Sequence, residues 1–357
     1  MTKMWRATVV IGTRPEAIKL APLLLELRAR GIVTRLVDSG QHRDIIDDVF
    51  ECFALTPDVR LGAVRPSQPL RELTARLLRG VGEELAANRP DVVVVQGDTT
   101  TAFAAALAAF YEGVPVAHVE AGLRTGDLAN PFPEEANRVL IARLAQYHFA
   151  PTSRARDALR SEGVTDDRIF VSGNTVVDAL QSVVRSLPGT RNDRAPVVAT
   201  LHRRESVGDA IRNVCVALRE AASSGVPVVV PVHPNPAVRA IVTAELGDAP
   251  NVSLLEPLAY RDFVALLASA RCVVTDSGGV QEEAATLGVP LLVARAQTER
   301  LEGLTSAIAS LADPLDLEAV RTALKRLLTQ SRSLEPSSPY GDGQAARRIV
   351  DALERRL

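Results

Sequence analysis

Short runs of apolar residues alternate with amphipathic segments along almost the whole chain. Most of these runs are continuously apolar, which is typical of strands that are covered on both faces in a parallel sheet. We predict strands over residues 7–12, 33–38, 91–97, 114–120, 147–151, 169–172, 197–201, 226–232, 252–255, 272–275 and 289–293.

The segments between the apolar runs have the spacing of amphipathic helices. We predict helices over residues 15–30, 70–88, 100–112, 134–146, 153–162, 175–186, 208–224, 261–269, 280–287, 317–329 and 343–357. Because strand and helix follow each other repeatedly, the pattern predicts an α/β fold built from doubly wound parallel sheets.

The alternation is interrupted once, at residues 187–196, where two prolines, a glycine and mixed charges are typical of a linker. We therefore predict a Rossmann-like domain over residues 1–186, a second one over 197–340, and a terminal helical segment over 341–357 that packs back on the first domain. Two such domains facing each other would form a central cleft at the carboxyl ends of both sheets, where ligands bind in this type of fold.

Composition narrows the class of protein. The chain has 357 residues with 41 Lys and Arg against 43 Asp and Glu, so a basic surface for nucleic acid is not expected. Its three cysteines form no CxxC pair, and no DxD motif or His/Cys cluster occurs, so we expect neither disulfides nor a metal. The first apolar run is too short for a signal peptide, and no apolar stretch reaches the roughly 20 residues that span a bilayer. We expect a cytoplasmic protein with no membrane partner.

Three acidic residues follow predicted strands or begin a predicted helix. Asp98 and Glu120 each stand where an apolar strand ends, and Glu134 follows a Pro-Phe-Pro segment at the start of a helix. Asp98 alone also suits a helix N-cap, and Glu134 alone suits a helix dipole. Three acids from three successive βα units favour acid/base catalysis instead, because crowded carboxylates shift one another's pKa.

Basic residues and glycines at other strand ends indicate phosphate binding. Arg14 and Lys19 flank the start of the first helix, where free N–H groups and the dipole favour an anion. That turn lacks GxGxxG, so NAD is not expected as a cofactor. Across the cleft we place His202, and a Gly-rich turn can bring backbone N–H groups against phosphate oxygens. This second group comprises His202, Ser277, Gly278, Gly279, Glu283 (for ribose hydroxyls) and Arg300.

In this order, the motifs resemble the non-hydrolysing UDP-N-acetylglucosamine 2-epimerases. The matching stretches are GTRPEAIKLAP, SGQHRD, GDTTTAFAAALAAFY, HVEAGLRTGDLANPFPEEANR, IFVSGNTVVDAL, HRRES, PVHPNP, TDSGGVQEEAATLG, TER and PYGDGQAARRI. The resemblance implies a glycosyltransferase-B type fold, usually a homodimer. It also implies reversible conversion of UDP-GlcNAc to UDP-ManNAc, with elimination of UDP to a 2-acetamidoglucal, and with no cofactor or metal.

Residue roles follow from the matching motifs. The resemblance makes Asp98, Glu120 and Glu134 the acid/base residues and has His202 stabilise the leaving diphosphate. It adds Phe263, as a neighbour of the uracil, to the UDP-binding set Arg14, Lys19, Phe263, Ser277, Gly278, Gly279, Glu283 and Arg300. Some family members are activated by a second UDP-GlcNAc near QHRxM, which makes Gln41 and His42 candidate regulatory residues.

The chain departs from the family pattern at several positions. Leu301 replaces the proline of TERPE, Ala296-Gln297 replace an Asp-Thr pair, and Leu201 replaces a small residue before HRRE. These departures bear on the fit around the nucleotide and on the sugar's 2-substituent. The alternatives are therefore an epimerase of another UDP-hexose, a sugar transferase or hydrolysing epimerase on the same scaffold, and a non-enzymatic nucleotide-sugar sensor.

Overall fold

The computed structural model describes residues 5–41, 43–65, 68–187, 195–202, 208–298, 300–304, 309–329 and 339–357. The chain divides into two compact units, one of Met1–Ala179 with Gly341–Leu357 and the other of Leu180–Tyr340. Most of the predicted linker, residues 188–194, lies outside the described residues.

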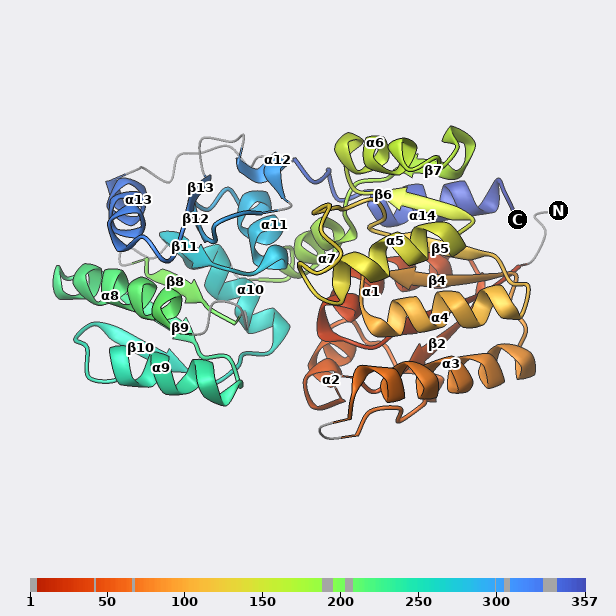
Figure 1. The fold of residues 1–357 in the computed structure, drawn as a ribbon, viewed down its shortest axis with the longest axis horizontal. Coiled ribbons are helices and arrows are strands. Elements are labelled where there is room, and N and C mark those ends of the chain that lie inside the picture. The colour runs from red at the N-terminus through yellow and green to blue at the C-terminus, as the bar shows by residue number, and fades with distance from the viewer. Residues whose placement is uncertain are drawn as a thin grey trace. The chain divides into compact units, whose positions relative to one another are not determined.

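The first unit is a seven-stranded parallel sheet in the order β3-β2-β1-β4-β5-β6-β7, with helices between the strands (Figure 1). Its strands are β1 (Arg6–Ile11), β2 (Val33–Asp38), β3 (Val59–Arg60), β4 (Val92–Gln96), β5 (Val116–Val119), β6 (Tyr147–Ala150) and β7 (Ile169–Val171). Its helices are α1 (Arg14–Ala29), α2 (Arg43–Cys52), α3 (Leu70–Ala87), α4 (Thr100–Tyr111), α5 (Glu134–Leu144), α6 (Ser153–Ser161) and α14 (Ala345–Glu354), with the 3-10 turn Asp166–Arg168. Helix α7 (Thr175–Val184) begins in this unit and ends in the second.

The second unit contains a six-stranded sheet in the order β10-β9-β8-β11-β12-β13. Its strands, all parallel, are β8 (Val197–Thr200), β9 (Val228–Pro231), β10 (Val252–Leu255), β11 (Cys272–Thr275), β12 (Leu291–Ala294) and β13 (Ala309–Ala312). The helices are α8 (Asp209–Ser223), α9 (Pro236–Leu246), α10 (Tyr260–Ser269), α11 (Gly278–Thr286), α12 (Leu301–Leu304) and α13 (Leu317–Thr329).

Each sheet reverses its strand order once, and this point fixes where a ligand can bind. The first sheet reverses between β1 and β4, which pair at Val9 and Val94, and the second between β8 and β11, which pair at Thr200 and Thr275. In open α/β sheets the crevice outside the carboxyl ends of the strands at such a reversal is the usual ligand site. The turns after β1, β4, β8 and β11 are therefore where ligand-contacting residues are expected in each unit.

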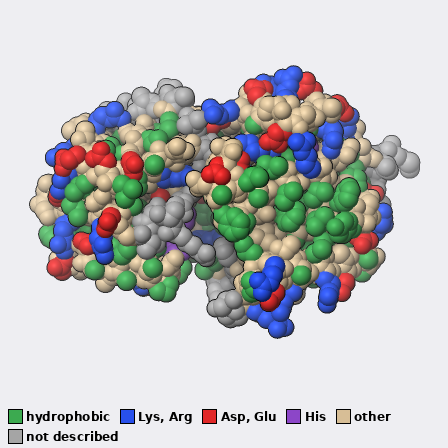
Figure 2. All heavy atoms as spheres, in the orientation of Figure 1, with side chains coloured by type: hydrophobic (Ala, Val, Ile, Leu, Met, Phe, Trp, Pro, Cys, Tyr) green, Lys and Arg blue, Asp and Glu red, His purple; other side chains and the backbone are tan. Residues whose placement is uncertain are grey.

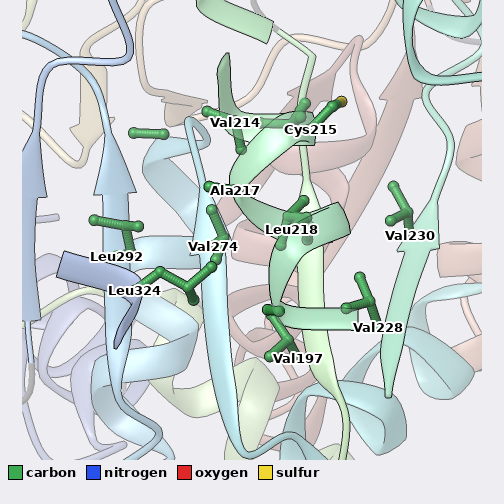
Figure 3. Packing of buried hydrophobic residues seen from close by; sticks show 14 of the residues in the cluster. Val197, Val214, Cys215, Ala217, Leu218, Val228, Val230, Val274, Leu292 and Leu324 are labelled. Carbon is green, nitrogen blue, oxygen red and sulfur yellow. The ribbon is translucent and has the colours of Figure 1, made fainter. Parts of the chain in front are cut away.

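The cores explain why the strands are continuously apolar. In the second unit, Val197, Val228, Val274 and Leu292 point from neighbouring strands to one side of the sheet, where Leu218 of α8 packs on them (Figure 3). Residues of the opposite pleat, such as Val273 and Leu291, form a separate cluster with α11. Both faces of the central strands β8, β11 and β12 are thus buried, as the sequence pattern predicts.

Helix α14 packs on α1 within the first unit (Figure 1). Arg30, which follows α1, pairs with Asp351 at 2.6 Å and with Glu354 at 2.7 Å. The backbone N–H groups of Ala345 and Ala346 donate to the Asp178 carboxylate at 3.2 and 2.9 Å, which satisfies the start of α14.

Of the elements that the structure describes, the sequence prediction missed six: β3, β13, α2, α9, α12 and the 3-10 turn Asp166–Arg168. It also placed the start of α11 at residue 280, whereas the helix begins at Gly278. The two glycines therefore belong to the first turn of the helix. Among the described residues, no helix has both the length and the apolar character needed to cross a membrane.

Candidate active site

The turn after β1 packs tightly against neighbouring turns. A Cβ atom on Gly12 would lie 2.2 Å from the Thr101 hydroxyl oxygen and 2.6 Å from that of Ser39. Only glycine fits there. The close approach brings the turns after β1, β2 and β4 together at the reversal point of the first sheet.

Glu120, at the end of β5, is a buried carboxylate surrounded by donors. Its Oε1 accepts from Lys19 Nζ at 2.5 Å and from Asn174 Nδ2 at 3.0 Å, while its Oε2 accepts from the Gln96 amide. An adjacent ammonium group and several donors favour the ionised form of a carboxylate. The direction of the Glu120 carboxylate is therefore fixed from β4, α1 and the turn before α7.

The backbone of Glu120 is itself unusual. Its φ of 64° lies in the left-handed region, which costs a residue other than glycine roughly 1–3 kcal/mol. The flanking peptide groups are tied into the sheet, since the Val119 carbonyl accepts from the Gly97 N–H and the Ala121 N–H donates to the Phe149 carbonyl, both at 3.0 Å. These bonds hold the strained turn in place. Such strain is concentrated at functional sites in other proteins.

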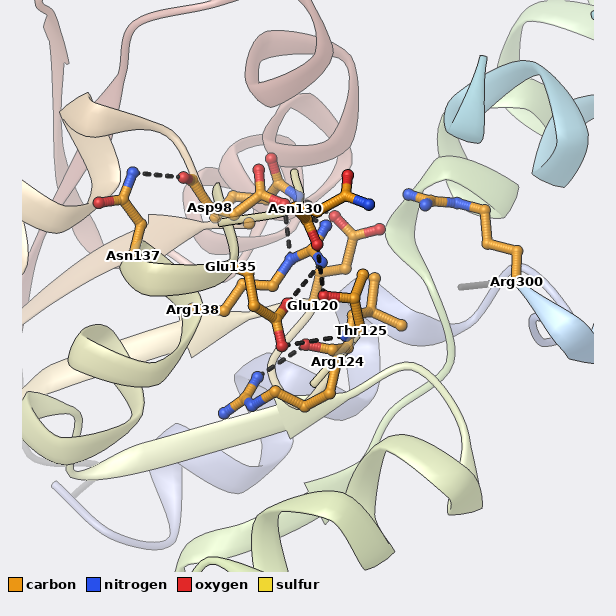
Figure 4. A network of polar contacts seen from close by, with 12 residues as sticks. Asp98, Glu120, Arg124, Thr125, Asn130, Glu135, Asn137, Arg138 and Arg300 are labelled. Carbon is orange, nitrogen blue, oxygen red and sulfur yellow. Dashed lines mark hydrogen bonds and ion pairs between the residues drawn. The ribbon is translucent and has the colours of Figure 1, made fainter. Parts of the chain in front are cut away.

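Asp98, at the end of β4, is held by the helix that carries Glu134. Arg138 of α5 donates to Asp98 Oδ2 through Nε at 2.8 Å and pairs through Nη2 at 2.6 Å, and Asn137 donates to the Asp98 carbonyl at 2.8 Å (Figure 4). Both guanidinium contacts go to the one oxygen Oδ2, so Arg138 holds that oxygen of the carboxylate in place.

The two glutamates at the start of α5 have different environments. Glu135 is buried and accepts from the backbone N–H groups of Thr125 and Gly126 at 2.9 and 3.0 Å, and from Arg138 at 2.9 Å (Figure 4). It fixes the loop after β5. Glu134, the first residue of the helix, is only half-buried, so a bound molecule can reach it.

Two buried histidines lie side by side behind these acids, on β5 and β6. His118 donates from Nε2 to the Gly97 carbonyl at 2.7 Å, and burial lowers its pKa to about 4. His148 pairs with it in sheet register, and burial lowers the pKa of His148 to about 3. Both histidines are neutral at physiological pH. They therefore contribute packing and the His118 hydrogen bond to the site, but no charge.

In the second unit, a carboxylate orients His202 at the end of β8. Asp276, which follows β11 and is buried, accepts from His202 Nδ1 at 2.6 Å and from the His202 backbone N–H at 3.0 Å. Because Nδ1 is engaged with Asp276, Nε2 is the ring nitrogen that can meet a ligand. Arg203 and Arg204 lie outside the described residues.

The start of α11 forms a second cationic feature of this unit. A Cβ atom on Gly278 would lie 2.5 Å from the guanidinium carbon of Arg300, so the glycine allows that guanidinium to lie against the helix N-terminus. Arg300 Nε donates to Glu282 at 3.0 Å, and the Ser277 hydroxyl makes no capping bond to the helix. A helix N-terminus beside an arginine is suited to an anion such as phosphate.

Comparisons with known proteins show the family to which this chain belongs. The profile of the family described as UDP-N-acetylglucosamine 2-epimerase matches residues 25–354. The chain is also 44% identical to the UDP-N-acetylglucosamine 2-epimerase of Salmonella typhimurium, over 98% of each protein. The chain belongs to the UDP-N-acetylglucosamine 2-epimerase family.

Solved structures agree with this family assignment. A structure of UDP-GlcNAc 2-epimerase from Neisseria meningitidis bound to UDP-GlcNAc has a TM-score of 0.93 and 38% identity, covering 98% of this chain and 100% of that one. The glycotransferase of kitacinnamycin, at 17% identity and a TM-score of 0.61, covers 99% of this chain and 95% of that one and shares the fold alone. The predicted α/β class, with two Rossmann-like domains of the glycosyltransferase type, is confirmed.

Within this epimerase-family chain, the first unit brings Lys19, Asp98 and Glu120 to one sheet edge. Lys19 contacts Glu120, and Arg14 pairs with Asp48 of α2 at 2.8 Å, so both cations have carboxylate partners. Gln41 accepts from Thr101 at 2.8 Å, and His42 lies outside the described residues.

The second unit contains the rest of the predicted set. Glu283 is buried and accepts from the Tyr260 hydroxyl at 3.1 Å, and Phe263 is half-buried against the cluster that contains Val273. Leu201, one of the departures from the family pattern, is buried in the core around α8. Its larger side chain is therefore accommodated in the core.

Sequence reasoning missed the residues that orient the acids and the histidine, namely Gln96, Arg138, Asn174 and Asp276, and also missed Glu282, which pairs with Arg300. Arg138 had a signal, because it stands four residues after Glu134 and so lies on the same face of α5. The other contacts depend on which strands are neighbours. Among the described residues, no group of three or more His, Cys, Asp or Glu side chains is placed to hold a metal ion.

Proposed function

We propose that this protein interconverts UDP-GlcNAc and UDP-ManNAc by inverting C2 of the sugar. The observation that carries the proposal is the pair of fixed carboxylates at adjacent strand ends, Glu120 held by Lys19 and Asp98 held by Arg138. Sequence similarity supports the proposal, because this chain is 44% identical to the UDP-N-acetylglucosamine 2-epimerase of Salmonella typhimurium over 98% of each protein. Inversion needs a proton removed from one face of C2 and returned to the other, which requires several positioned carboxylates.

The proposed reaction begins with elimination. A carboxylate takes the proton from C2, the C2–H electrons form the C1–C2 double bond, and the C1–O electron pair leaves with UDP. The product is a 2-acetamidoglucal. UDP then returns to C1 while a second carboxyl group protonates C2 from the opposite face. We assign these proton transfers to Asp98, Glu120 and Glu134 as a group. No atom changes its net oxidation state over the cycle, so the reaction requires no redox cofactor.

We assign UDP to the second unit. His202, oriented by Asp276, and the α11 N-terminus beside Arg300 carry the features that stabilise a departing diphosphate. In this proposal Ser277, Gly278 and Gly279 meet phosphate oxygens, Glu283 meets ribose hydroxyls, and Phe263 neighbours the uracil. Arg14 and Lys19 of the first unit complete the proposed set, and Gln41 and His42 are proposed regulatory residues. The predicted boundaries at residues 186, 196 and 340 then separate an acid/base domain from a nucleotide domain.

We also propose a cytoplasmic homodimer. Hydrophobic side chains gather on the face of the first unit where α4 lies (Figure 2). Phe110 and Tyr111 at the end of α4 are 58% and 66% exposed, and Leu140 of α5 is 46% exposed. Apolar patches of this kind are typical of protein interfaces. A second copy of the chain is the partner that the family resemblance implies.

The test of the reaction is isotope exchange at C2. Incubating UDP-GlcNAc with the protein in D₂O and following it by ¹H NMR should yield UDP-ManNAc, with deuterium at C2 of both sugars. A transferase or a hydrolysing epimerase consumes UDP-GlcNAc irreversibly, releasing free sugar or a new glycoside. A nucleotide-sugar sensor binds UDP-GlcNAc and leaves its spectrum unchanged. Either of the last two results would reject the proposal.

A further inference from the structure

The carboxylate of Glu16 on α1 is buried, with 1% of the residue exposed, and accepts hydrogen bonds from four groups. Its Oε2 accepts from the Gly12 N–H at 3.1 Å and from the Thr13 N–H and hydroxyl, each at 2.7 Å. Its Oε1 accepts from the Thr99 hydroxyl at 2.7 Å. Glu16 therefore connects the turn after β1 with the turn after β4.

Both threonines are helix caps. Thr13 is the N-cap of α1, and Thr99 is the N-cap of α4 and accepts from the Ala102 N–H at 3.0 Å. A hydroxyl that accepts from a helix N–H still has one hydrogen to donate. Glu16 accepts that hydrogen from both caps. One side chain thus orients the first turns of both helices at the reversal point of the sheet.

Glu16 also occupies the place of a ligand anion. The N–H groups before α1 point at its carboxylate, and the dipole of a 16-residue helix favours a negative charge there. Burial raises the pKa of Glu16 to about 7 against the effect of its donors, so the carboxylate is charged at mildly alkaline pH.

We infer that Glu16 is a positioning residue, an internal anion that fixes the Asp98 turn relative to the helix that carries Lys19. Asp98 immediately precedes Thr99, and Lys19 lies three residues after Glu16 on α1, with its ammonium group on Glu120. Asp98 and Glu120, two of the three carboxyl groups assigned to the C2 proton transfer, are therefore both positioned through one buried group. This inference rests on the proposed epimerase reaction.

The test is chemical rescue of Glu16→Ala at pH 8.5. A misplacement of about 1 Å costs roughly a hundredfold in rate, so we expect kcat to fall about ten- to hundredfold while KM changes little. Formate, a small carboxylate, should then raise kcat of this variant several-fold, and chloride at equal ionic strength should not. Glu26→Ala, on the same helix, is the matched control, and should retain kcat and show no response to formate.

A second variant and a second measurement keep the outcomes distinct. Glu16→Gln preserves shape and should lose about tenfold in kcat without formate rescue, and wild-type kcat in this variant would overturn the inference even if Glu16→Ala does not fold. Amide hydrogen exchange at Gly12 and Thr13 should accelerate in Glu16→Gln, independently of turnover. If the wild-type protein lacks epimerase activity, the proposed function fails, and unchanged exchange at these two amides would overturn the inference separately.

Discussion

At the scale of single residues, the site depends on how carboxylates are held more than on which acids are present. Glu120 is held by Lys19, and one carboxylate oxygen of Asp98 is held by Arg138. Both pairs are largely buried, where losing one partner leaves an uncompensated charge. The pairs therefore position the reactive groups, and the proposed UDP contacts come from other residues of the chain, apart from Lys19, which belongs to both sets.

We expect substitution of the acidic residues to lower kcat and to leave UDP binding nearly unchanged. Asp98→Asn and Glu120→Gln each remove a proton-transfer group, so kcat should fall by about 10²–10⁴ in either variant. UDP affinity, measured by titration calorimetry, should stay within a few-fold of wild type because most of the proposed UDP-binding residues lie in the other unit. Glu83→Gln, an exposed glutamate on α3, is the control and should be fully active. Full turnover in both acid variants would reject the roles assigned to them.

At the scale of elements, the ends of helices carry the site. Helix α1 begins with a Thr13–Glu16 capping box, α4 begins at a Thr99 cap, and α11 begins without a side-chain cap but beside Arg300. The first two helices supply their own oxygen acceptors. Helix α11 leaves N–H groups for an external anion, which distinguishes a structural N-terminus from one suited to a ligand.

The two glycines that begin α11 should respond oppositely to alanine. At Gly278 the new methyl group would lie 2.5 Å from the Arg300 guanidinium carbon and displace it from Glu282, whereas at Gly279 no atom of another described segment lies within 4 Å. Gly278→Ala should lower the free energy of unfolding by about 1–3 kcal/mol. Gly279→Ala should raise it by up to about 1 kcal/mol through helix propensity. Urea unfolding of the two variants measures both, and equal values would contradict the packing of Arg300.

At the scale of the whole molecule, the sequence predicts the fold well because its strands are buried on both faces and so are continuously apolar. Two of the missed elements have no clear pattern in the sequence. Strand β3 has only two residues, and helix α9 begins at Pro236 in a Pro-Asn-Pro segment that is typical of a turn. Proline is nevertheless favourable in a first helical turn. The acids at strand ends were predictable, but their partners were not. Lys19 and Glu120 are 101 residues apart, and they meet because β4 lies between β1 and β5.

Three buried groups of the first unit contribute to the dependence of the molecule's stability on acid pH. Burial lowers the pKa of His118 from 6.5 to about 4 and the pKa of His148 from 6.5 to about 3, so below pH 6.5 the unfolded chain binds up to two more protons than the native state. Glu16 acts in the opposite direction, because its pKa is raised from 4.5 to about 7 and the native state holds one extra proton between those values. The net difference from about pH 6 to 4.5 is one proton, so these groups lower stability by about 1.4 kcal/mol per pH unit on acidification.

Two variants separate these contributions. Glu16→Gln removes the offsetting proton, so the slope of unfolding free energy against pH should increase by about 1.4 kcal/mol per pH unit. His148→Gln removes one histidine, so the slope should decrease by a similar amount. Urea unfolding at several pH values between 4.5 and 6 measures both slopes against wild type, in which all other titrating groups are shared. The change in slope is independent of any constant loss of stability caused by the substitution itself. Parallel curves for Glu16→Gln and wild type would show that Glu16 is ionised throughout this range, and hence that its four donors outweigh the effect of burial on its pKa.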